Sequence, residues 1–215
     1  MATKKSVQKS TQKFVLGVKQ NMSQSFGEDG RVQPVTILNV GAMTVTAIKT
    51  SEKDGYKAVQ VGFGERRQKN IAKAQQGQFG SLGNFRYIKE FRLPSDAEVK
   101  VNVGDKLDLS AFATGDNIVV SAISKGKGFQ GVVKRHGFKG GPRSHGQKHS
   151  EREPGSISGG LRTVLRHGMR MAGRMGGDRV TIKNLKINGI DVAAGTISVT
   201  GAVPGRRGTL VEIRG

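Results

Sequence analysis

One glycine-rich run has the spacing of a phosphate-binding loop. Gly126–Gly131 matches the pattern G-x-G-x-x-G, follows a predicted strand, and has Glu151 twenty residues after its last glycine. In dinucleotide-binding proteins this pattern places a pyrophosphate at the N-terminus of the helix that follows. Gly137 and Gly140–Pro142 disfavour a stable helix here. We therefore expect no nucleotide cofactor. A dinucleotide-dependent enzyme, which is a different class of protein, remains the alternative hypothesis.

Two histidines in the same region have the spacing of paired metal ligands on a helix. His145 and His149 are four residues apart, but Gly146 and Pro142 disfavour a helix between them. The chain has no cysteine, and the neighbouring lysines and arginines would repel a metal cation. Because metal sites need several converging ligands, we expect no metal here and interpret these histidines as solvated or as contacts to an anionic partner.

Groups for acid–base or nucleophilic catalysis are also scarce. Glu151, Glu153 and Asp178 are the only acids in this region, and Gly155–Gly159 misses the nucleophile pattern G-x-S-x-G by one position. We therefore predict that the protein is not an enzyme and has no catalytic residue, cofactor or small-molecule substrate.

What recurs in this region is positive charge among glycines. The chain has 215 residues, with 36 Lys and Arg against 16 Asp and Glu, for a net charge of +20. Lys125–Arg179, called the basic segment below, contains 13 of the cations, 14 glycines, all 4 histidines and 3 acids. Half of the net charge thus lies in about a quarter of the chain. Charge of this size predicts a polyanionic partner.

A row of cations in a glycine-rich chain is typical of binding to folded RNA. Each Lys or Arg that neutralises a phosphate releases counterions, and glycine lets the backbone approach closely and turn. No helix of the major-groove type carries the charge, and no zinc-finger spacing is present, so DNA is less favoured. A free-standing architectural nucleic-acid protein and a merely solvated charge run are the alternatives.

The predicted RNA-binding residues combine these cations with side chains that could stack on bases. Phe129, Phe138 and the histidines could stack on unpaired bases, but each phenylalanine ring could equally pack beneath a β domain. The predicted RNA-binding set is Lys125, Lys127, Phe129, Gln130, Lys134, Arg135, His136, Lys139, Arg143, His145, Lys148, Arg152, Arg162, Arg166, Arg170, Arg174 and Arg179.

The basic segment is too poor in apolar residues to fold by itself. Leu, Ile, Val and Phe account for 8 of its 55 residues, against 45 of the other 160. Burial of so little apolar area would not offset the conformational entropy lost on ordering. We therefore expect a partner to order the segment, and we expect the flanking sequence to fold.

The flanking sequence is typical of a small all-β domain. Val and Ile together number 34 against 10 Leu, and β-branched residues favour strands. Asp54-Gly55 and Asn188-Gly189 indicate hairpins, and residues 65–76 could form a surface helix. The predicted strands are Val35–Val40, Met43–Lys49, Tyr56–Val61, Phe85–Phe91, Glu98–Val103, Asn117–Ile123, Arg179–Ile187, Thr196–Thr200 and Thr209–Arg214.

Residues 1–13 carry several lysines and no acid, so they predict a flexible basic N-terminus. No stretch approaches the roughly 18 apolar residues of a membrane span, so no membrane contact is expected. The absence of cysteine is consistent with a reducing compartment. Because strands flank the basic segment, the simplest topology is one β domain interrupted by a long basic loop.

The motifs resemble one known family along nearly the whole chain. Ser124–Gly146 is similar to the signature of the universal third protein of the large ribosomal subunit, in its bacterial form (the ribosomal protein uL3 family). The similarity continues, in the expected order, through Glu28–Val32, Asp54–Tyr56, Val61–Gly64, Pro154–Ile157, Met171–Gly176, Arg179–Thr181 and Gly201–Gly205.

This resemblance implies a mainly β fold: a closed β-barrel of the translation-protein type, a small accessory α+β part and a long extended basic loop. The implied divisions are 1–13 as the N-terminus, 14–124 with 179–215 as the barrel domain, an accessory subdomain at about 64–100, and 125–178 as the loop. Some bacterial members carry a methylated glutamine in this loop, but Ser158 and Gly159 occupy that stretch. We therefore expect no such modification here.

The resemblance also implies a structural role in the large ribosomal subunit. The implied partners are large-subunit (23S-type) ribosomal RNA, bound early in assembly, and neighbouring large-subunit proteins. The loop is expected to reach toward the peptidyl transferase centre. The implied location is the ribosome of the cytoplasm, with an organellar ribosome not excluded.

Overall fold

The chain divides into two compact units. The computed structural model describes residues 13–27, 30–95, 97–158 and 164–215. The first unit combines Met1–Ile123 with Val180–Gly215, and the second unit is Ser124–Arg179. The second unit holds the basic segment. The expected flexible N-terminus lies outside the described residues apart from Lys13.

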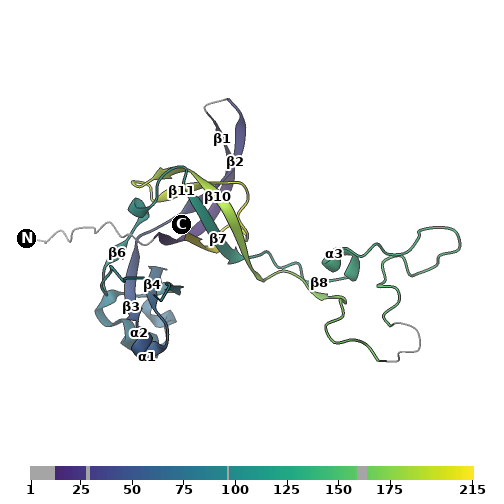
Figure 1. The fold of residues 1–215 in the computed structure, drawn as a ribbon, viewed down its shortest axis with the longest axis horizontal. Helices are drawn as coiled ribbons and strands as arrows, with labels where there is room; N and C mark the ends of the chain where they lie inside the picture. Colours follow the sequence, from purple (N-terminus) through teal and green to yellow (C-terminus); the bar gives the residue numbers. More distant parts are fainter. Residues whose placement is uncertain (1–12, 28–29, 96, 159–163) are drawn as a thin grey trace, which may run out of the picture. The chain divides into compact units, whose positions relative to one another are not determined.

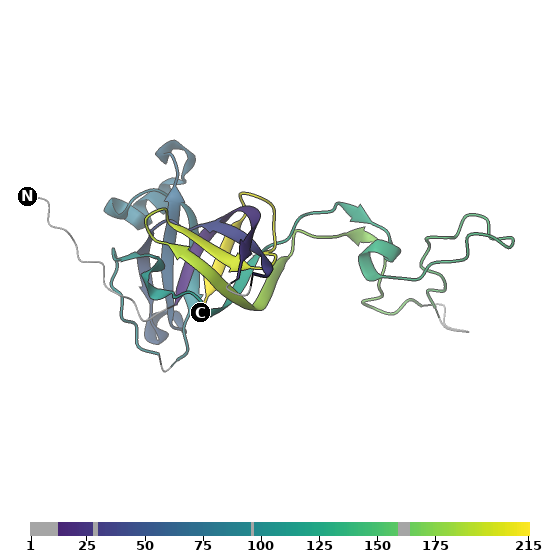
Figure 2. The ribbon, with the colours of Figure 1, turned by 90° about the horizontal axis from the view of Figure 1, so that it is seen from above.

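The first unit contains a closed antiparallel barrel (Figure 1), which confirms the predicted fold class. Strands from the two ends of the chain lie side by side in it, as Figure 2 shows for the purple and yellow ribbons. The chain leaves the barrel at the end of one strand, β7, and re-enters at the start of its neighbour, β10. The barrel strands in spatial order are β1 (Phe14–Phe26), β12 (Leu210–Arg214), β7 (Asn117–Ile123), β10 (Arg179–Asp191), β11 (Thr196–Thr200) and β2 (Val32–Asn39).

A four-stranded antiparallel sheet completes the first unit. Its strands in spatial order are β5 (Phe85–Arg92), β4 (Ala58–Glu65), β3 (Met43–Lys49) and β6 (Lys106–Leu107). The connecting chain forms the short helices α1 (Ser51–Asp54) and α2 (Lys73–Phe79) and the 3₁₀ turns η1 (Gln68–Asn70) and η2 (Gly80–Leu82), and a further 3₁₀ turn, η3 (Leu109–Ala111), follows β6 on the way to β7. This sheet and its connections span residues 43–107, a wider range than the 64–100 expected for an accessory subdomain.

One hydrophobic core joins the barrel to the sheet. Leu16 of β1 and Val59 of β4 are both fully buried in it. The rings of Phe14 and Phe91 stack with their centroids 4.2 Å apart, and the backbone N–H of Leu16 donates to Sδ of Met43 at 3.1 Å. Because burial of apolar area drives folding, the apolar strands of the flanking sequence fold as one unit.

Two of the predicted strand features were wrong. Glu98–Val103 contains no strand; Val101 is buried, but the chain then turns, with Asp105 N–H donating to the Asn102 carbonyl. The predicted hairpin at Asn188-Gly189 is instead a shift in register within the β10–β11 pair. A glycine inside a strand often marks such a bulge rather than a turn.

Two other expectations were incomplete. Strand β1 was missed because its second half, Gln20–Ser25, is polar and has no β-branched residue. This half pairs with β2 in a hairpin. The hairpin expected at Asp54-Gly55 does join β3 to β4, but one helical turn, α1, makes the connection, and Gly55 ends it at φ +77°.

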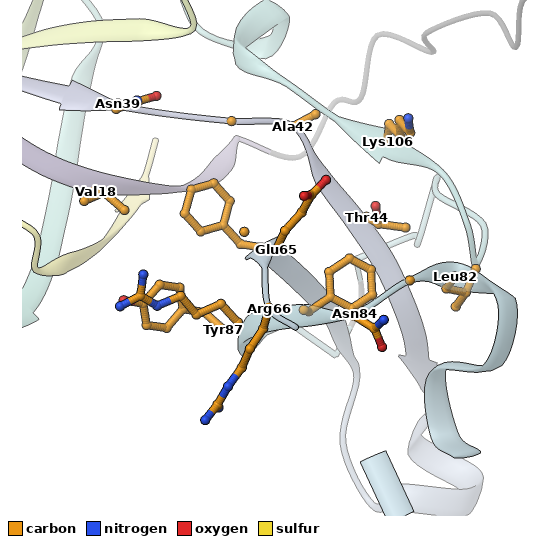
Figure 3. Close-up of a pocket in the computed structure, with 16 residues that line it drawn as sticks. Val18, Asn39, Ala42, Thr44, Glu65, Arg66, Leu82, Asn84, Tyr87 and Lys106 are labelled. Atoms are coloured by element: carbon orange, nitrogen blue, oxygen red, sulfur yellow. The ribbon is translucent and has the colours of Figure 1, made fainter. Parts of the chain in front are cut away.

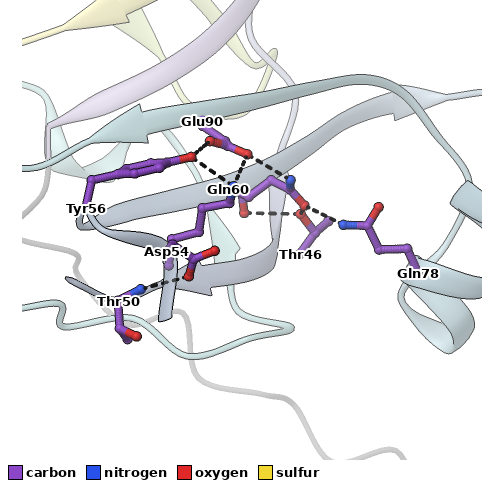
Figure 4. Close-up of polar contacts among 8 residues, drawn as sticks. Thr46, Thr50, Asp54, Tyr56, Gln60, Gln78 and Glu90 are labelled. Carbon is purple, nitrogen blue, oxygen red and sulfur yellow. Dashed lines mark hydrogen bonds and ion pairs between the residues drawn. The ribbon is translucent and has the colours of Figure 1, made fainter. Parts of the chain in front are cut away.

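A polar network lies on the four-stranded sheet (Figure 4). The Tyr56 hydroxyl donates to Oε2 of Glu90 at 2.9 Å, and Nε2 of Gln60 donates to Oε1 at 3.3 Å. Nζ of Lys49 lies 3.2 Å from Oε1 of Glu90. Burial opposes the charge of Glu90, but these contacts together outweigh it and hold its pKa below the ordinary value.

We expect Glu90→Gln to weaken the first unit most at neutral pH. A carboxyl whose pKa is lower in the folded chain stabilises the fold above its unfolded pKa, and this contribution disappears as the pH falls through the folded pKa. The free energy of unfolding of the variant should be lower by about 1 kcal/mol at pH 7, and the difference should shrink between about pH 5 and pH 3. Urea unfolding followed by circular dichroism at each pH measures it. Glu52→Gln, an exposed change on α1, is the control; an equal pH dependence in both variants would contradict the assignment.

Candidate nucleic-acid interface

The two ends of the basic segment pair with each other. Ser124 N–H donates to the Asp178 carbonyl at 2.8 Å, Lys127 N–H to the Met175 carbonyl at 2.9 Å, and Met175 N–H to the Gly128 carbonyl at 3.0 Å. Beyond them, β8 (Phe129–Gln130) and β9 (Gly173–Arg174) form a two-stranded antiparallel ribbon. The segment therefore has its own backbone-paired base, which composition did not predict.

Glycine is required where the backbone crosses itself. Gly176 has φ +76°, and a Cβ at this position would overlap the carbonyl oxygen of Lys125. Gly140 has φ +75°, and a Cβ there would overlap the carbonyl oxygen of Glu151. Only glycine takes up this backbone conformation readily and leaves room for so close an approach.

A short helix follows the G-x-G-x-x-G run, contrary to the prediction that none would. Helix α3 (Val132–His136) begins after Gly131 and ends at Gly137, which has φ +73° and donates its N–H to the Val133 carbonyl. Val132 is buried. The helix has a single turn and ends in Lys134, Arg135 and His136, so it differs from the long helix that opens a dinucleotide fold.

Two predicted RNA-binding residues make internal contacts instead of facing solvent fully. Nη1 of Arg135 donates to the Met171 carbonyl at 2.7 Å, and Nε2 of His136 lies 3.1 Å from the same oxygen. A Cβ at Gly173 would lie 2.8 Å from Nη1 of Arg135. These contacts tie α3 to the irregular chain just before β9, so both side chains have a structural role in the free chain.

A second internal contact joins Arg143 to Glu151. Nε of Arg143 donates to Oε1 of Glu151 at 2.6 Å, next to the hydrogen bond from Gly141 N–H to the Glu151 carbonyl. The Arg143 side chain is 83% exposed, so the ion pair is solvated and contributes little stability. Such a pair could open at little cost and leave Arg143 to another anion.

Most of the other predicted residues lie at the surface. Gln130 is half-buried and donates to the Lys127 carbonyl. Arg179 begins β10, is exposed and has a further contact within the chain. Arg162 lies outside the described residues. Besides Arg179, the exposed members of the predicted set are Lys125, Lys127, Phe129, Lys134, Lys139, Arg143, His145, Lys148, Arg152, Arg166, Arg170 and Arg174.

The two phenylalanines of the segment differ in their surroundings. Phe129 is 77% exposed and lies opposite Arg174 in the β8–β9 ribbon, so it does not pack in a core. Phe138 is half-buried and lines a hollow of about 390 Å³ with Ile157, Met169 and the cations Arg166 and Arg170. The predicted RNA-binding set included neither Ile157 nor Met169, although apolar residues are rare in this segment and therefore noticeable.

The described part of the segment holds no metal-binding cluster. His145 and His149 are both exposed, and no group of three His, Asp or Glu side chains among the described residues could hold an ion. No helix in the described ranges is long and apolar enough to cross a membrane.

Basic charge clustered on one glycine-rich segment of a β protein is a mark of nucleic-acid-binding proteins. The family model described as ribosomal protein L3 matches residues 96–203. Similar proteins include large ribosomal subunit protein uL3 of Finegoldia magna, 43% identical over 205 residues that cover 94% of this chain and 97% of that protein. The uL3 proteins of Mycobacterium tuberculosis and Nocardia farcinica are 47% and 45% identical, covering 94% and 93% of this chain and 95% and 91% of theirs.

The chain therefore belongs to the ribosomal protein L3 family. This confirms the resemblance drawn from the motifs. Members of this family are structural ribosomal proteins, and the barrel fold agrees with that membership.

We expect Gly176→Ala to break the pairing at the base of the basic segment, because its Cβ would overlap the Lys125 carbonyl and its φ is positive. Gly126→Ala is the matched control, since Gly126 has ordinary φ and a Cβ there would meet no atom within 4 Å. Hydrogen exchange at the Lys127 and Met175 amides should accelerate at least tenfold in the first variant only. Equal exchange in both variants would show that the crossing does not hold the base together.

Proposed function

We propose that this protein is a structural constituent of the large ribosomal subunit, and that its basic segment binds large-subunit ribosomal RNA. The observation that carries this proposal is the exposure of twelve Lys, Arg and His residues of the predicted set, in a segment with little core of its own. Family membership supports the ribosomal role. The protein acts within the ribosome, without catalysis, cofactor or small-molecule substrate.

Phosphate neutralisation is the proposed mechanism. Lys125, Lys127, Lys134 and Lys139 are exposed, and no acid of the described residues pairs with any of them. Each would release condensed counterions on meeting a phosphate. The surrounding glycines allow the chain to follow an irregular RNA surface, and the exposed ring of Phe129 could stack on an unpaired base.

The internal contacts of the segment fit this role. The pairing of residues 124–130 with 173–178 and the contacts of Arg135 to Met171 set the course of the chain before binding. Partial preorganisation lowers the entropy lost when the remaining residues become ordered. The segment would complete its folding on RNA early in assembly, and neighbouring large-subunit proteins would cover other surfaces. Its distal part would extend toward the peptidyl transferase centre.

We expect glutamine at Lys125, Lys127, Lys134 and Lys139 together to weaken binding to a large-subunit rRNA transcript by on the order of a hundredfold at 0.15 M salt. The slope of log affinity against log salt should fall by about 3 to 4. The matched control replaces four exposed lysines of the first unit, Lys53, Lys69, Lys73 and Lys100. Filter binding across a salt series measures both. Equal losses in the two variants would contradict a dedicated role for the basic segment.

We expect the basic segment of the free protein to exchange its amide hydrogens much faster than the barrel strands. Val132 is its only fully buried apolar residue among those described, so local opening should be inexpensive. Addition of the rRNA transcript should slow exchange across the segment. Hydrogen exchange with mass spectrometry measures this, and barrel peptides serve as the internal control. Uniform protection in the free chain would mean that the segment folds without a partner.

A further inference from the structure

A groove in the first unit lies outside the basic segment (Figure 3). It has a volume of about 860 Å³ and is lined by residues of β1, β2, β3, β4, β5 and β6. Figure 3 shows Val18 and Tyr87 on one side, Leu82 and Asn84 on the other, and Glu65 and Arg66 between them. The volume is within the range of about 300–1,000 Å³ common for small-molecule and nucleotide sites.

Three cations line this groove without acidic partners. Arg66, Arg86 and Lys106 are exposed, and none forms an ion pair with another described residue. Glu65 is the only acid among the described residues of the lining. The groove therefore carries a net charge of about +2 and favours an anion such as a phosphodiester.

The groove also holds a stack of planar groups. The rings of Phe63 and Tyr87 lie nearly parallel, with centroids 6.4 Å apart and an interplanar angle of 21°. The guanidinium of Arg86 lies over the Tyr87 ring at 5.2 Å. Phe63 is buried, whereas Tyr87 and Arg86 are accessible. Aromatic rings and guanidinium planes are the groups on which proteins stack unpaired RNA bases.

The polar lining could read the edge of a base. Asn39 and Asn84 are exposed amides, each able to donate and accept. The Glu65 carboxylate can only accept, so it suits an amino group of a base or a ribose 2′-hydroxyl rather than a phosphate. A nucleotide site needs a planar stack for the base, amides for the edge of the base and unpaired cations for the phosphates, and this groove has all three.

We propose that this groove binds one unpaired nucleotide of the large-subunit rRNA. The base lies beside Tyr87 and Arg86, and the flanking phosphates meet Arg66 and Lys106. This inference rests on the proposed ribosomal function, but it concerns a different surface from the basic segment. It gives the first unit a contact that depends on an unstacked base, whereas the basic segment relies mainly on charge.

The test uses the full chain and a large-subunit rRNA transcript. Arg66→Gln with Arg86→Gln should weaken binding about tenfold at 0.15 M salt and lower the salt slope by between about one and two. Lys53→Gln with Lys100→Gln removes the same charge from exposed sites outside the groove and should change the affinity less than about threefold. Thermal unfolding should be alike in both double variants. Equal losses in both would overturn the groove site.

Photo-crosslinking identifies the contact without relying on a variant. RNA containing 4-thiouridine should crosslink to the peptide that holds Arg86 and Tyr87 as well as to the basic segment. Crosslinks confined to the basic segment would overturn the groove site and leave the proposed function intact. A chain that fails to bind the transcript at all would overturn the proposed function itself. Binding of AMP at micromolar concentration with no effect on RNA affinity would instead assign the groove to a free nucleotide, against the proposal.

Discussion

The cost of burying unpaired cations is the constraint on which the structure of the basic segment depends. Thirteen Lys and Arg within 55 residues cannot be buried together, because an unpaired buried charge is far too costly. Order in the segment therefore comes from backbone hydrogen bonds at residues 124–130 and 173–178 and from glycines that let the chain cross itself. The apolar core belongs almost wholly to the first unit.

Under this constraint the cations divide into two kinds. Arg135 is half-buried and donates to a backbone carbonyl, a contact that suits a guanidinium because it satisfies a donor without requiring a buried acid. Most of the others remain in solvent, where a phosphate can replace water without the loss of a protein contact. A segment with more internal ion pairs would be more ordered in the free chain, but fewer of its charges would remain available to an anionic partner. Its low apolar content and its exposure are therefore two consequences of the same composition.

Sequence patterns predict strands well where burial and β-branching coincide, as in Met43–Lys49 and Asn117–Ile123, whose bounds match β3 and β7. They fail where a strand has neither signal, as in the second half of β1, which lacks β-branched residues and is held by its pairing with β2. The exposed cations of the candidate interface could be read from composition, since charge alone places them in solvent. The contact of Arg135 to Met171 spans 36 residues, and the groove gathers residues of six strands. Neither this contact nor the groove could be predicted from a local sequence pattern, because each joins residues that are far apart in the chain.

Charge outside the basic segment bears on the proposed binding of RNA. The other 160 residues carry the remaining net charge of +10, and their described part folds around an apolar core that needs no counterion. Charge retained on a stable β unit increases its self-repulsion, so it is better explained by contact with the same polyanion than by solubility alone. Arg66, Arg86 and Lys106 place part of this charge in the groove that contains the accessible Tyr87 ring. A preformed site of this kind would bind before the basic segment is ordered, and would raise the effective RNA concentration that the segment then encounters.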